Sequence, residues 1–187
     1  MEAEAFVSRD VDLLLDVGLG QISTSSRIAR LVADIRQWRR EYPDWRDARQ
    51  AIEARYGYDK YPGHCHVVPN HALMIMALLY APHDFSGAQT IVCTSGWDTD
   101  CNAGNVGCLM GAMLGLEGIE ANRDWRGRIA DRMLISSADG AARSTTRCAS
   151  ARASSTADAD SPACRLSSRL KRARSFTFRI QAACKDS

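Results

Sequence analysis

The chain has 187 residues, enough for one domain with a hydrophobic core plus a tail, and its 45% hydrophobic and 25% charged residues are typical of a globular protein. The net charge of +2 conceals an uneven distribution: residues 1–140 hold 14 Lys and Arg against 19 Asp and Glu, whereas residues 141–187 hold 10 Lys and Arg against 3 Asp. The longest apolar run, Ala72 to Ala81, is too short to span a bilayer, which argues against a membrane protein.

Cysteine usage and the first residues indicate the compartment. The seven cysteines are odd in number and form no CxxC pair, so we interpret them as reduced thiols rather than as a disulfide framework. The opening residues, MEAEAF, are acidic and do not resemble the basic and then apolar start of a signal peptide. Both features predict a cytoplasmic protein.

Apolar residues recur at helical spacing through much of the first 140 residues. The predicted helices, in chain order, are Val11–Leu19, Ile28–Trp38 behind the capping hydroxyls of residues 23–26, Asp44 to about Gly57, Ala72–Tyr80 with Pro69 in a first turn, Asp84 or Ser86 to about Ser95, Asn102–Leu116 and Trp125–Leu134. The segment Ala72–Tyr80 is apolar on all sides and is therefore expected to be buried. No stretch alternates over the length of a strand, so the predicted fold class is all-α.

The composition changes near Gly140. Residues 141–187 are rich in Ala, Ser and Arg and contain few large apolar residues, so this segment cannot bury enough surface to offset its ordering entropy. We expect a helical domain over residues 1–140 and a disordered basic tail over residues 141–187. A basic tail can bind nucleic acid, but the arginines lack regular spacing and aromatic neighbours outside Arg174 to Arg179, which makes that partner unlikely.

Glycines are unusually frequent in the predicted helix Asn102–Leu116. Gly107, Gly111 and Gly115 are four residues apart and would form a ridge on one helix face. Each interior glycine costs roughly 0.5–1 kcal/mol relative to alanine, so the ridge predicts the close approach of a neighbouring helix and a place in the middle of a bundle.

Directly before this helix, the run GWDTDCNAGNVG (residues 96–107) places two carboxylates two positions apart, at Asp98 and Asp100. One interpretation is helix capping, because an Asp at a helix start accepts backbone N–H bonds and favours the positive end of the dipole. The other is a divalent-metal site, because neighbouring negative charges are unfavourable without a cation and Mg²⁺ prefers oxygen ligands. The residues alone leave both open.

Two smaller groups of residues also have alternative interpretations. His64, Cys65, His66 and His71 have the residue types of a zinc site, but no second pair of ligands lies nearby in the sequence. We therefore favour the interpretation of His66 and Asn70 as buried hydrogen-bonding groups at the start of a helix. Trp97, beside the two carboxylates, can stack on an adenine or a ribose, or pack in the core.

Three blocks of the sequence resemble the ADP-ribosylglycohydrolase family. GWDTDCNAGNVGCLMGAMLG is similar to the family's C-terminal signature, in which a G-x-D-[ST]-D block precedes a helix of small residues. HVVPNHALMIMALLY resembles an upstream helix of the family, and EAEAFVSRDVDLLLDVGLGQI the segment before that helix. The match covers about residues 2–139 and includes the spacing between the blocks.

The resemblance implies an all-α hydrolase with two Mg²⁺ (or Mn²⁺) ions in a cleft. It would cleave the glycosidic bond between ADP-ribose and a protein side chain or a small molecule. Asp98 and Asp100 would be metal ligands, together with Cys101 at a position that is often Thr or Ser in the family. A thiol is a poor ligand for a hard ion, so the Cys101 carbonyl or a water could substitute. Trp97, Asn102 and His66 are expected to border the substrate.

One family motif is missing. The family's other metal ligands come from an Asp-Asp motif in its N-terminal half, and this chain contains no Asp-Asp pair. The expected acid/base residue belongs to that half too, so no catalytic residue is assigned. We therefore expect an incomplete bundle that corresponds to the C-terminal portion of the family, with a separate N-terminal half as a possible partner. The alternative function is that of a non-catalytic fragment or split half retaining part of an ADP-ribose-binding surface.

Overall fold

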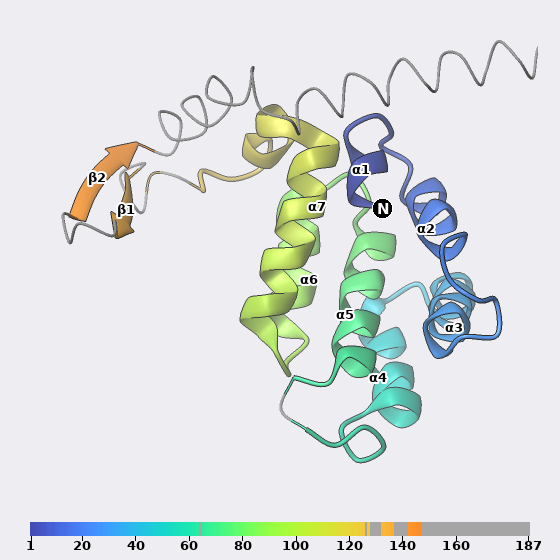
Figure 1. Cartoon of the computed structure of the whole chain (residues 1–187). Coiled ribbons are helices and arrows are strands. Elements are labelled where there is room, and N and C mark those ends of the chain that lie inside the picture. Colours follow the sequence, from blue (N-terminus) through green and yellow to red (C-terminus); the bar gives the residue numbers. More distant parts are fainter. Residues whose placement is uncertain (64, 126, 128–131, 137–141, 147–187) are drawn as a thin grey trace, which may run out of the picture. The chain divides into compact units, whose positions relative to one another are not determined.

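The computed structural model describes residues 1–63, 65–125, 127, 132–136 and 142–146 (Figure 1). The helices are α1 (Glu2–Ala5), α2 (Val11–Leu19), α3 (Arg27–Glu41), α4 (Trp45–Tyr56), α5 (Val67–Tyr80), α6 (Phe85–Thr94) and α7 (Thr99–Glu120), and the strands are β1 (Arg132–Ser136) and β2 (Ala142–Thr146). Two compact units contain these elements, Met1–Trp125 with the helices and Arg126–Ser187 with the strands.

Helix α5 is the centre of the helical unit. Ten of its 14 residues are buried, and it packs against α2, α3, α4, α6 and α7 (Figure 1). Its sequence explains this position, because a helix that is apolar all round has to be covered on every side. The prediction of a buried helix in this segment with Pro69 in its first turn is confirmed, and the helix begins at Val67.

Helices α2, α3, α4 and α6 are amphipathic, and these four helices and α5 begin at side chains that accept hydrogen bonds from backbone N–H groups. Helix α3, for example, buries Leu31, Val32 and Ile35 and exposes most of its arginines. The capping side chains are Asp10 of α2, Ser26 of α3, Asp44 of α4, His66 of α5 and Asp84 of α6. The all-α prediction is confirmed for this unit, and the predicted helix Val11–Leu19 coincides with α2.

The glycine-rich helix α7 differs from its prediction in two respects. It lies against α6, α5 and α1, on one flank of the unit rather than in its middle. A Cβ at Gly107 would lie 3.0 Å from Nε2 of Gln89 on α6, so a side chain approaches closely there. At Gly115 no described atom of a neighbouring segment lies within 4 Å of the position that a Cβ would take. Its φ of +69° interrupts the helix instead. The missing side chain lets Gln89 approach the helix at Gly107, and it permits the positive φ at Gly115.

The predicted helix Trp125–Leu134 is wrong at residues 132–134, and its residues 126 and 128–131 lie outside the described residues. Residues 132–136 form strand β1, which pairs antiparallel with β2 in a register that places Arg132 opposite Thr146 and Ser136 opposite Ala142. Backbone pairing between separate segments supplies hydrogen bonds that the spacing of a few apolar residues does not reveal. Strand β2 also lies within the segment expected to be disordered, and residues 147–187 lie outside the described residues. The domain division at residue 140 stays a prediction.

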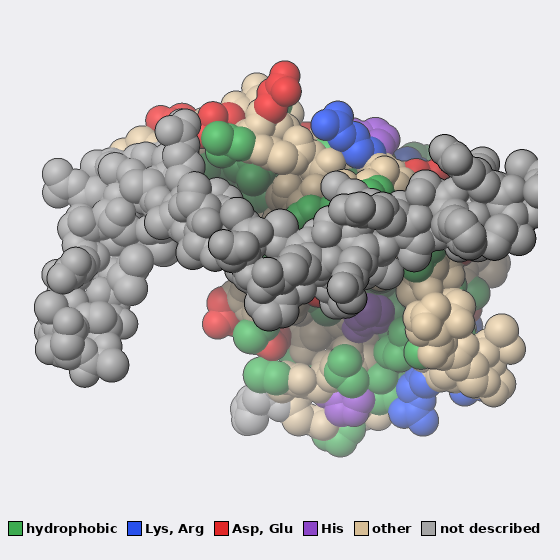
Figure 2. Space-filling model, turned by 45° about the horizontal axis from the view of Figure 1, so that its top comes forward, with side chains coloured by type: hydrophobic (Ala, Val, Ile, Leu, Met, Phe, Trp, Pro, Cys, Tyr) green, Lys and Arg blue, Asp and Glu red, His purple; other side chains and the backbone are tan. Residues whose placement is uncertain are grey.

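The surface of the helical unit carries charged and apolar side chains side by side (Figure 2). The most exposed large apolar residues are Phe6 at 73% and Val67 at 63%. Phe6 follows α1 directly, and Val67 is the first residue of α5. Among the residues that the structure describes, no helix has both the length and the apolarity needed to cross a membrane.

Candidate metal centre

The short loop that connects α6 to α7 has an unusual backbone and leads into the candidate site. Gly96 has a φ of +84° and Trp97 a φ of +62°, so two successive residues adopt the left-handed conformation, which is rare for a tryptophan. Nε of Arg49, on α4, donates to the carbonyl of Ser95 at 2.8 Å. The Thr99 N–H donates to the carbonyl of Trp97 at 3.0 Å, which closes the turn. The loop is therefore held from both sides before α7 begins.

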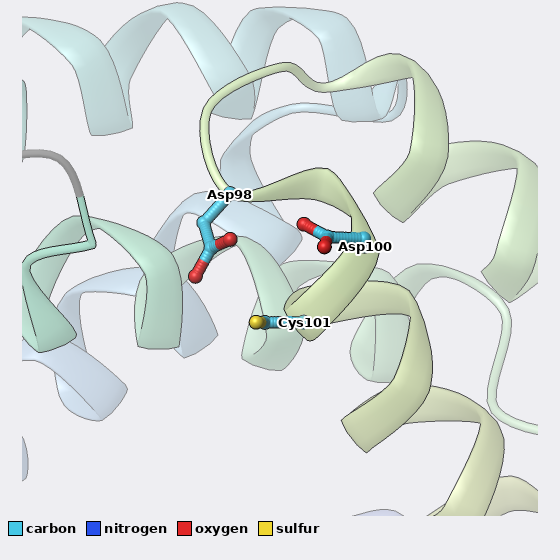
Figure 3. Close-up of side chains that lie close together, drawn as sticks. All are labelled: Asp98, Asp100 and Cys101. Atoms are coloured by element: carbon cyan, nitrogen blue, oxygen red, sulfur yellow. The ribbon is translucent and has the colours of Figure 1, made fainter.

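Asp98, Asp100 and Cys101 lie together at the start of α7. Each offers one ligand atom, a carboxylate oxygen or a thiol sulfur, and these three atoms lie within 4.8 Å of one another. Their side chains extend from the first turn of α7 toward the same space (Figure 3). Asp98 is half-buried, whereas Asp100 and Cys101 are exposed. The structure thus brings the three predicted metal ligands into one group that is open to solvent.

Asp98 occupies the N-cap position of α7 but its side chain makes no capping hydrogen bond. Its backbone carbonyl accepts the first helical bond, from the Asn102 N–H at 3.0 Å. The capping interpretation therefore does not account for the Asp98 carboxylate. Asp100 is in the first turn, where a negative charge interacts favourably with the helix dipole.

Among the described residues, no ion pair compensates the negative charges of this cluster. None of the ion pairs within the described part of the chain includes Asp98 or Asp100. The hydrogen bond with Asp98, followed by the charges of Asp98 and Asp100, raises the pKa of the Cys101 thiol. Desolvation, followed by the charge of Asp98, raises the pKa of the Cys65 thiol. Both thiols therefore stay protonated at neutral pH, as is expected next to excess negative charge.

The predicted substrate residues His66 and Asn102 are both engaged in structural hydrogen bonds. Nδ1 of His66 accepts from the Val68 N–H at 3.1 Å and so caps α5. Asn102 is only 1% exposed, and its Nδ2 donates to Oδ1 of Asn70 at 2.9 Å. The interpretation of His66 and Asn70 as buried hydrogen-bonding groups at a helix start is confirmed for Asn70, whereas His66 makes the hydrogen bond but is only half-buried. A substrate-binding role for His66 and Asn102 stays a prediction.

Trp97 packs against two side chains. Its ring stacks on Tyr58 with centroids 5.1 Å apart and an interplanar angle of 22°, and the guanidinium carbon of Arg49 lies 4.1 Å from its centroid. Stacking of Trp97 on an adenine or a ribose stays a prediction.

The zinc alternative receives no support from the residues that are described. Cys65, His66 and His71 are not part of any described group of three potential ligands, and His64 lies outside the described residues. His71 lines a cavity of about 230 Å³ with Met74, Ile75, Leu78 and other mostly apolar residues. Burial lowers the pKa of His71, which favours the neutral imidazole.

Fold and site together define a class of protein. It is an all-α domain in which a helix-connecting loop presents two carboxylates as candidate ligands of a divalent cation.

The family model described as ADP-ribosylglycohydrolase matches residues 1–157. The chain belongs to the ADP-ribosylglycohydrolase family, which at the family level consists of hydrolases acting on ADP-ribosylated substrates. No curated protein and no solved structure matches the chain.

Several residues of the site environment could not be recognised in the sequence. Tyr58 lies in a loop without periodicity and Arg49 on an ordinary amphipathic helix, yet both contact Trp97. Asn70 was expected to be buried, but nothing in the sequence indicates that it contacts the loop before α7. These contacts join residues 28 or more positions apart, and local patterns do not show them.

Proposed function

We propose that this chain binds a divalent cation, Mg²⁺ or Mn²⁺, through Asp98 and Asp100 and acts in the metal-dependent hydrolysis of ADP-ribosyl glycosidic bonds. The observation that carries the proposal is the state of the Asp98 carboxylate. It sits at a helix start without capping that helix, beside a second carboxylate, and neither takes part in a described ion pair. Family membership supplies the reaction class.

The donor set fits a hard divalent ion in part. Two carboxylates on one turn can share a cation or hold a pair, and Mg²⁺ keeps several waters when proteins supply few ligands. The Cys101 thiol fits less well, because sulfur favours softer ions and its raised pKa keeps it protonated. We therefore assign the ligand role to Asp98 and Asp100 and expect Cys101 to contribute through a bound water, because its carbonyl accepts from Nδ2 of Asn105 at 3.0 Å.

The cation would orient the ribose hydroxyls and lower the pKa of a bound water. The chain's own contribution is the placement of the two carboxylates. The left-handed residues Gly96 and Trp97 direct the backbone so that Asp98 and Asp100 face the same space. Exposure of Asp100 keeps that space accessible to a sugar.

We expect the chain by itself to bind Mg²⁺ weakly and to hydrolyse slowly. Within the described residues a single turn supplies the candidate ligands, whereas affinity depends on ligand number and on fixed geometry. The same observation favours the second candidate function, a non-catalytic portion that retains part of an ADP-ribose-binding surface. A separate polypeptide carrying an Asp-Asp motif would then complete the site.

Calorimetric titration with Mg²⁺ and Mn²⁺, combined with an assay for ADP-ribose release from modified arginine and serine peptides, tests both functions. The proposal predicts measurable cation binding that is lost in Asp100→Asn, with release well below that of a typical enzyme. Unchanged binding in Asp100→Asn would contradict the ligand assignment. ADP-ribose binding without any release, even with cation present, would favour the non-catalytic function.

A further inference from the structure

We infer that Asn70 is the positioning residue of the cation site: its side-chain amide fixes the loop that aims Asp98, and thereby sets the affinity for the cation. This inference rests on the proposed function for the cation part, and on the hydrogen bonds below for the positioning part.

Asn70 uses its full hydrogen-bonding capacity inside the protein. It is 5% exposed. Its Nδ2 donates to the hydroxyl of Tyr58 at 2.7 Å and to the carbonyl of His66 at 3.0 Å. Its Oδ1 accepts from the Asp98 N–H at 3.2 Å and from Nδ2 of Asn102 at 2.9 Å. Two donors and two acceptor positions are all that an asparagine amide has, so its orientation is fully determined.

These four bonds join three separate segments at one point. Tyr58 belongs to the loop before α5, His66 caps α5, and Asp98 and Asn102 begin α7. A buried network in which every group is satisfied is rigid, because each broken bond leaves a desolvated polar group behind. Asn70 therefore transmits the rigidity of the central helix α5 to the turn that carries the carboxylates.

The bond to the Asp98 N–H matters because of the residue before it. Trp97 has a φ of +62°, a conformation that a bulky residue keeps only when its surroundings impose it. The Asn70 oxygen holds the peptide group that follows Trp97. Loss of that acceptor removes the restraint on the peptide group after Trp97 and favours a return to negative φ, which would turn the Asp98 side chain away from Asp100.

Three variants separate positioning from general stability. Asn70→Leu has nearly the same shape and removes all four bonds. Asn70→Asp keeps an acceptor oxygen for the Asp98 N–H but loses both N–H donors. Gln89→Leu is the matched control, because Gln89 is also a buried amide, at 9% exposure, whose Nε2 donates to α7 at the Ala103 carbonyl, away from the carboxylates.

Two measurements on the full chain test the inference, Mn²⁺ affinity from the electron paramagnetic resonance of free Mn²⁺ and hydrogen exchange of the Asp98 amide by NMR. Asn70→Leu is expected to weaken Mn²⁺ binding by about 10–100-fold, the effect typical of a residue that orients a metal ligand. It should also accelerate exchange of the Asp98 amide. Gln89→Leu should leave the Mn²⁺ affinity and the exchange rate of the Asp98 amide close to wild type, although it lowers the melting temperature. Asn70→Asp should retain the protection of the Asp98 amide.

The outcomes distinguish the inference from the proposed function. Faster Asp98 exchange in Asn70→Leu, in a chain that binds no Mn²⁺ even as wild type, would sustain the positioning role and overturn the cation role and the proposed function. Wild-type affinity and wild-type exchange in Asn70→Leu would overturn the inference while leaving the proposed function intact. Equal losses in Asn70→Leu and Gln89→Leu would reduce Asn70 to a packing residue. If Asn70→Leu does not fold, Asn70→Ala, which also lacks the acceptor for the Asp98 N–H, takes its place against Gln89→Leu in the same two measurements.

Discussion

The aspartates of this protein behave differently in two regions. In α2 to α4 and at the start of α6 most of them have partners: Asp10, Asp44 and Asp84 cap helices, Asp12 and Asp16 bind Arg36, and Asp34 binds Arg55 and the Tyr56 hydroxyl. At the start of α7, Asp98 caps nothing and neither it nor Asp100 has a described ion pair. The same residue type in the same local position serves stability in one region and is left available for a ligand in the other.

The helix starts at Asp84 and Asp98 make the comparison concrete. Both residues precede a helix at the N-cap position. The Asp84 carboxylate accepts from the Gly87 N–H at 3.0 Å and from Asn122 at 3.1 Å. Asp98 instead follows a residue with a left-handed backbone, and its own φ of −82° and ψ of 66° depart from the extended conformation of Asp84. Backbone geometry, rather than residue identity, separates a cap from a candidate ligand.

The largest expected effect comes from replacing the carboxylates on each side of this comparison. Asp98→Asn with Asp100→Asn should lower the affinity for Mn²⁺ by at least about 100-fold, because carboxylates supply the charge that holds a hard cation. The capping pair Asp44→Asn with Asp84→Asn should leave the affinity within about threefold, since asparagine caps almost as well and neither residue faces the site. Calorimetry or the resonance of free Mn²⁺ measures both. Equal losses in the two double variants would remove the distinction between the regions.

The buried partner of Asp34 provides the next largest effect. Tyr56 is 5% exposed and its hydroxyl donates to the Asp34 carboxylate. Tyr56→Phe should lower the free energy of unfolding by about 1.5 kcal/mol, the range for a hydrogen bond to a charged group. Arg55→Gln removes a mostly exposed cation from the ion pair with Asp34 and should cost less than about 1 kcal/mol. Denaturant melts of the two variants at neutral pH measure the difference.

The same contact predicts a dependence on pH. Burial, followed by the hydrogen bond with Asp34, raises the pKa of Tyr56 from 10.0 to about 12. Because the folded protein holds this proton more tightly than the unfolded chain, the stabilisation is fully present below the unfolded pKa of about 10 and is lost as pH rises toward 12. Denaturant melts at pH values between about 10 and 12 should show that the wild type loses unfolding free energy faster than Tyr56→Phe as the pH rises. Parallel loss in both proteins would show that Tyr56 does not titrate in this window.

A smaller effect is expected for the caps themselves. Asp84→Ala removes an acceptor from the first turn of α6 and should cost about 1 kcal/mol of unfolding free energy. Asp98→Ala should change stability by less than about 0.5 kcal/mol, because no cap is lost and a like-charge contact is relieved. Thermal melts without divalent cations compare the two. A cost at Asp98 equal to that at Asp84 would mean that Asp98 is only a structural helix start.

The sequence predicts what depends on nearby residues and misses what depends on distant ones. Helix α2 and the cap at Asp44 follow from periodicity and a side chain at the right position. The pairing of β1 with β2 and the kink at Gly115 do not, because the first joins separate segments and the second depends on a backbone angle that several glycines could adopt. At the site, the carboxylates and the thiol could be named in advance, whereas the Asn70 hydrogen bonds that hold them depend on tertiary structure.

The smallest expected effect concerns Cys101 and refines the account of the α7 region. Cys101→Ser replaces the thiol by a hydroxyl, a harder donor that suits Mg²⁺ better, but hydroxyls are weak ligands beside carboxylates. Mg²⁺ affinity should therefore rise by about two- to threefold, with no change in unfolding free energy, since Cys101 is exposed. Cys108→Ser, another exposed cysteine of α7, is the matched control and should leave the affinity unchanged. A tenfold fall in Mg²⁺ affinity in Cys101→Ser would instead make the sulfur a ligand, and the cluster would then belong with sites for softer cations.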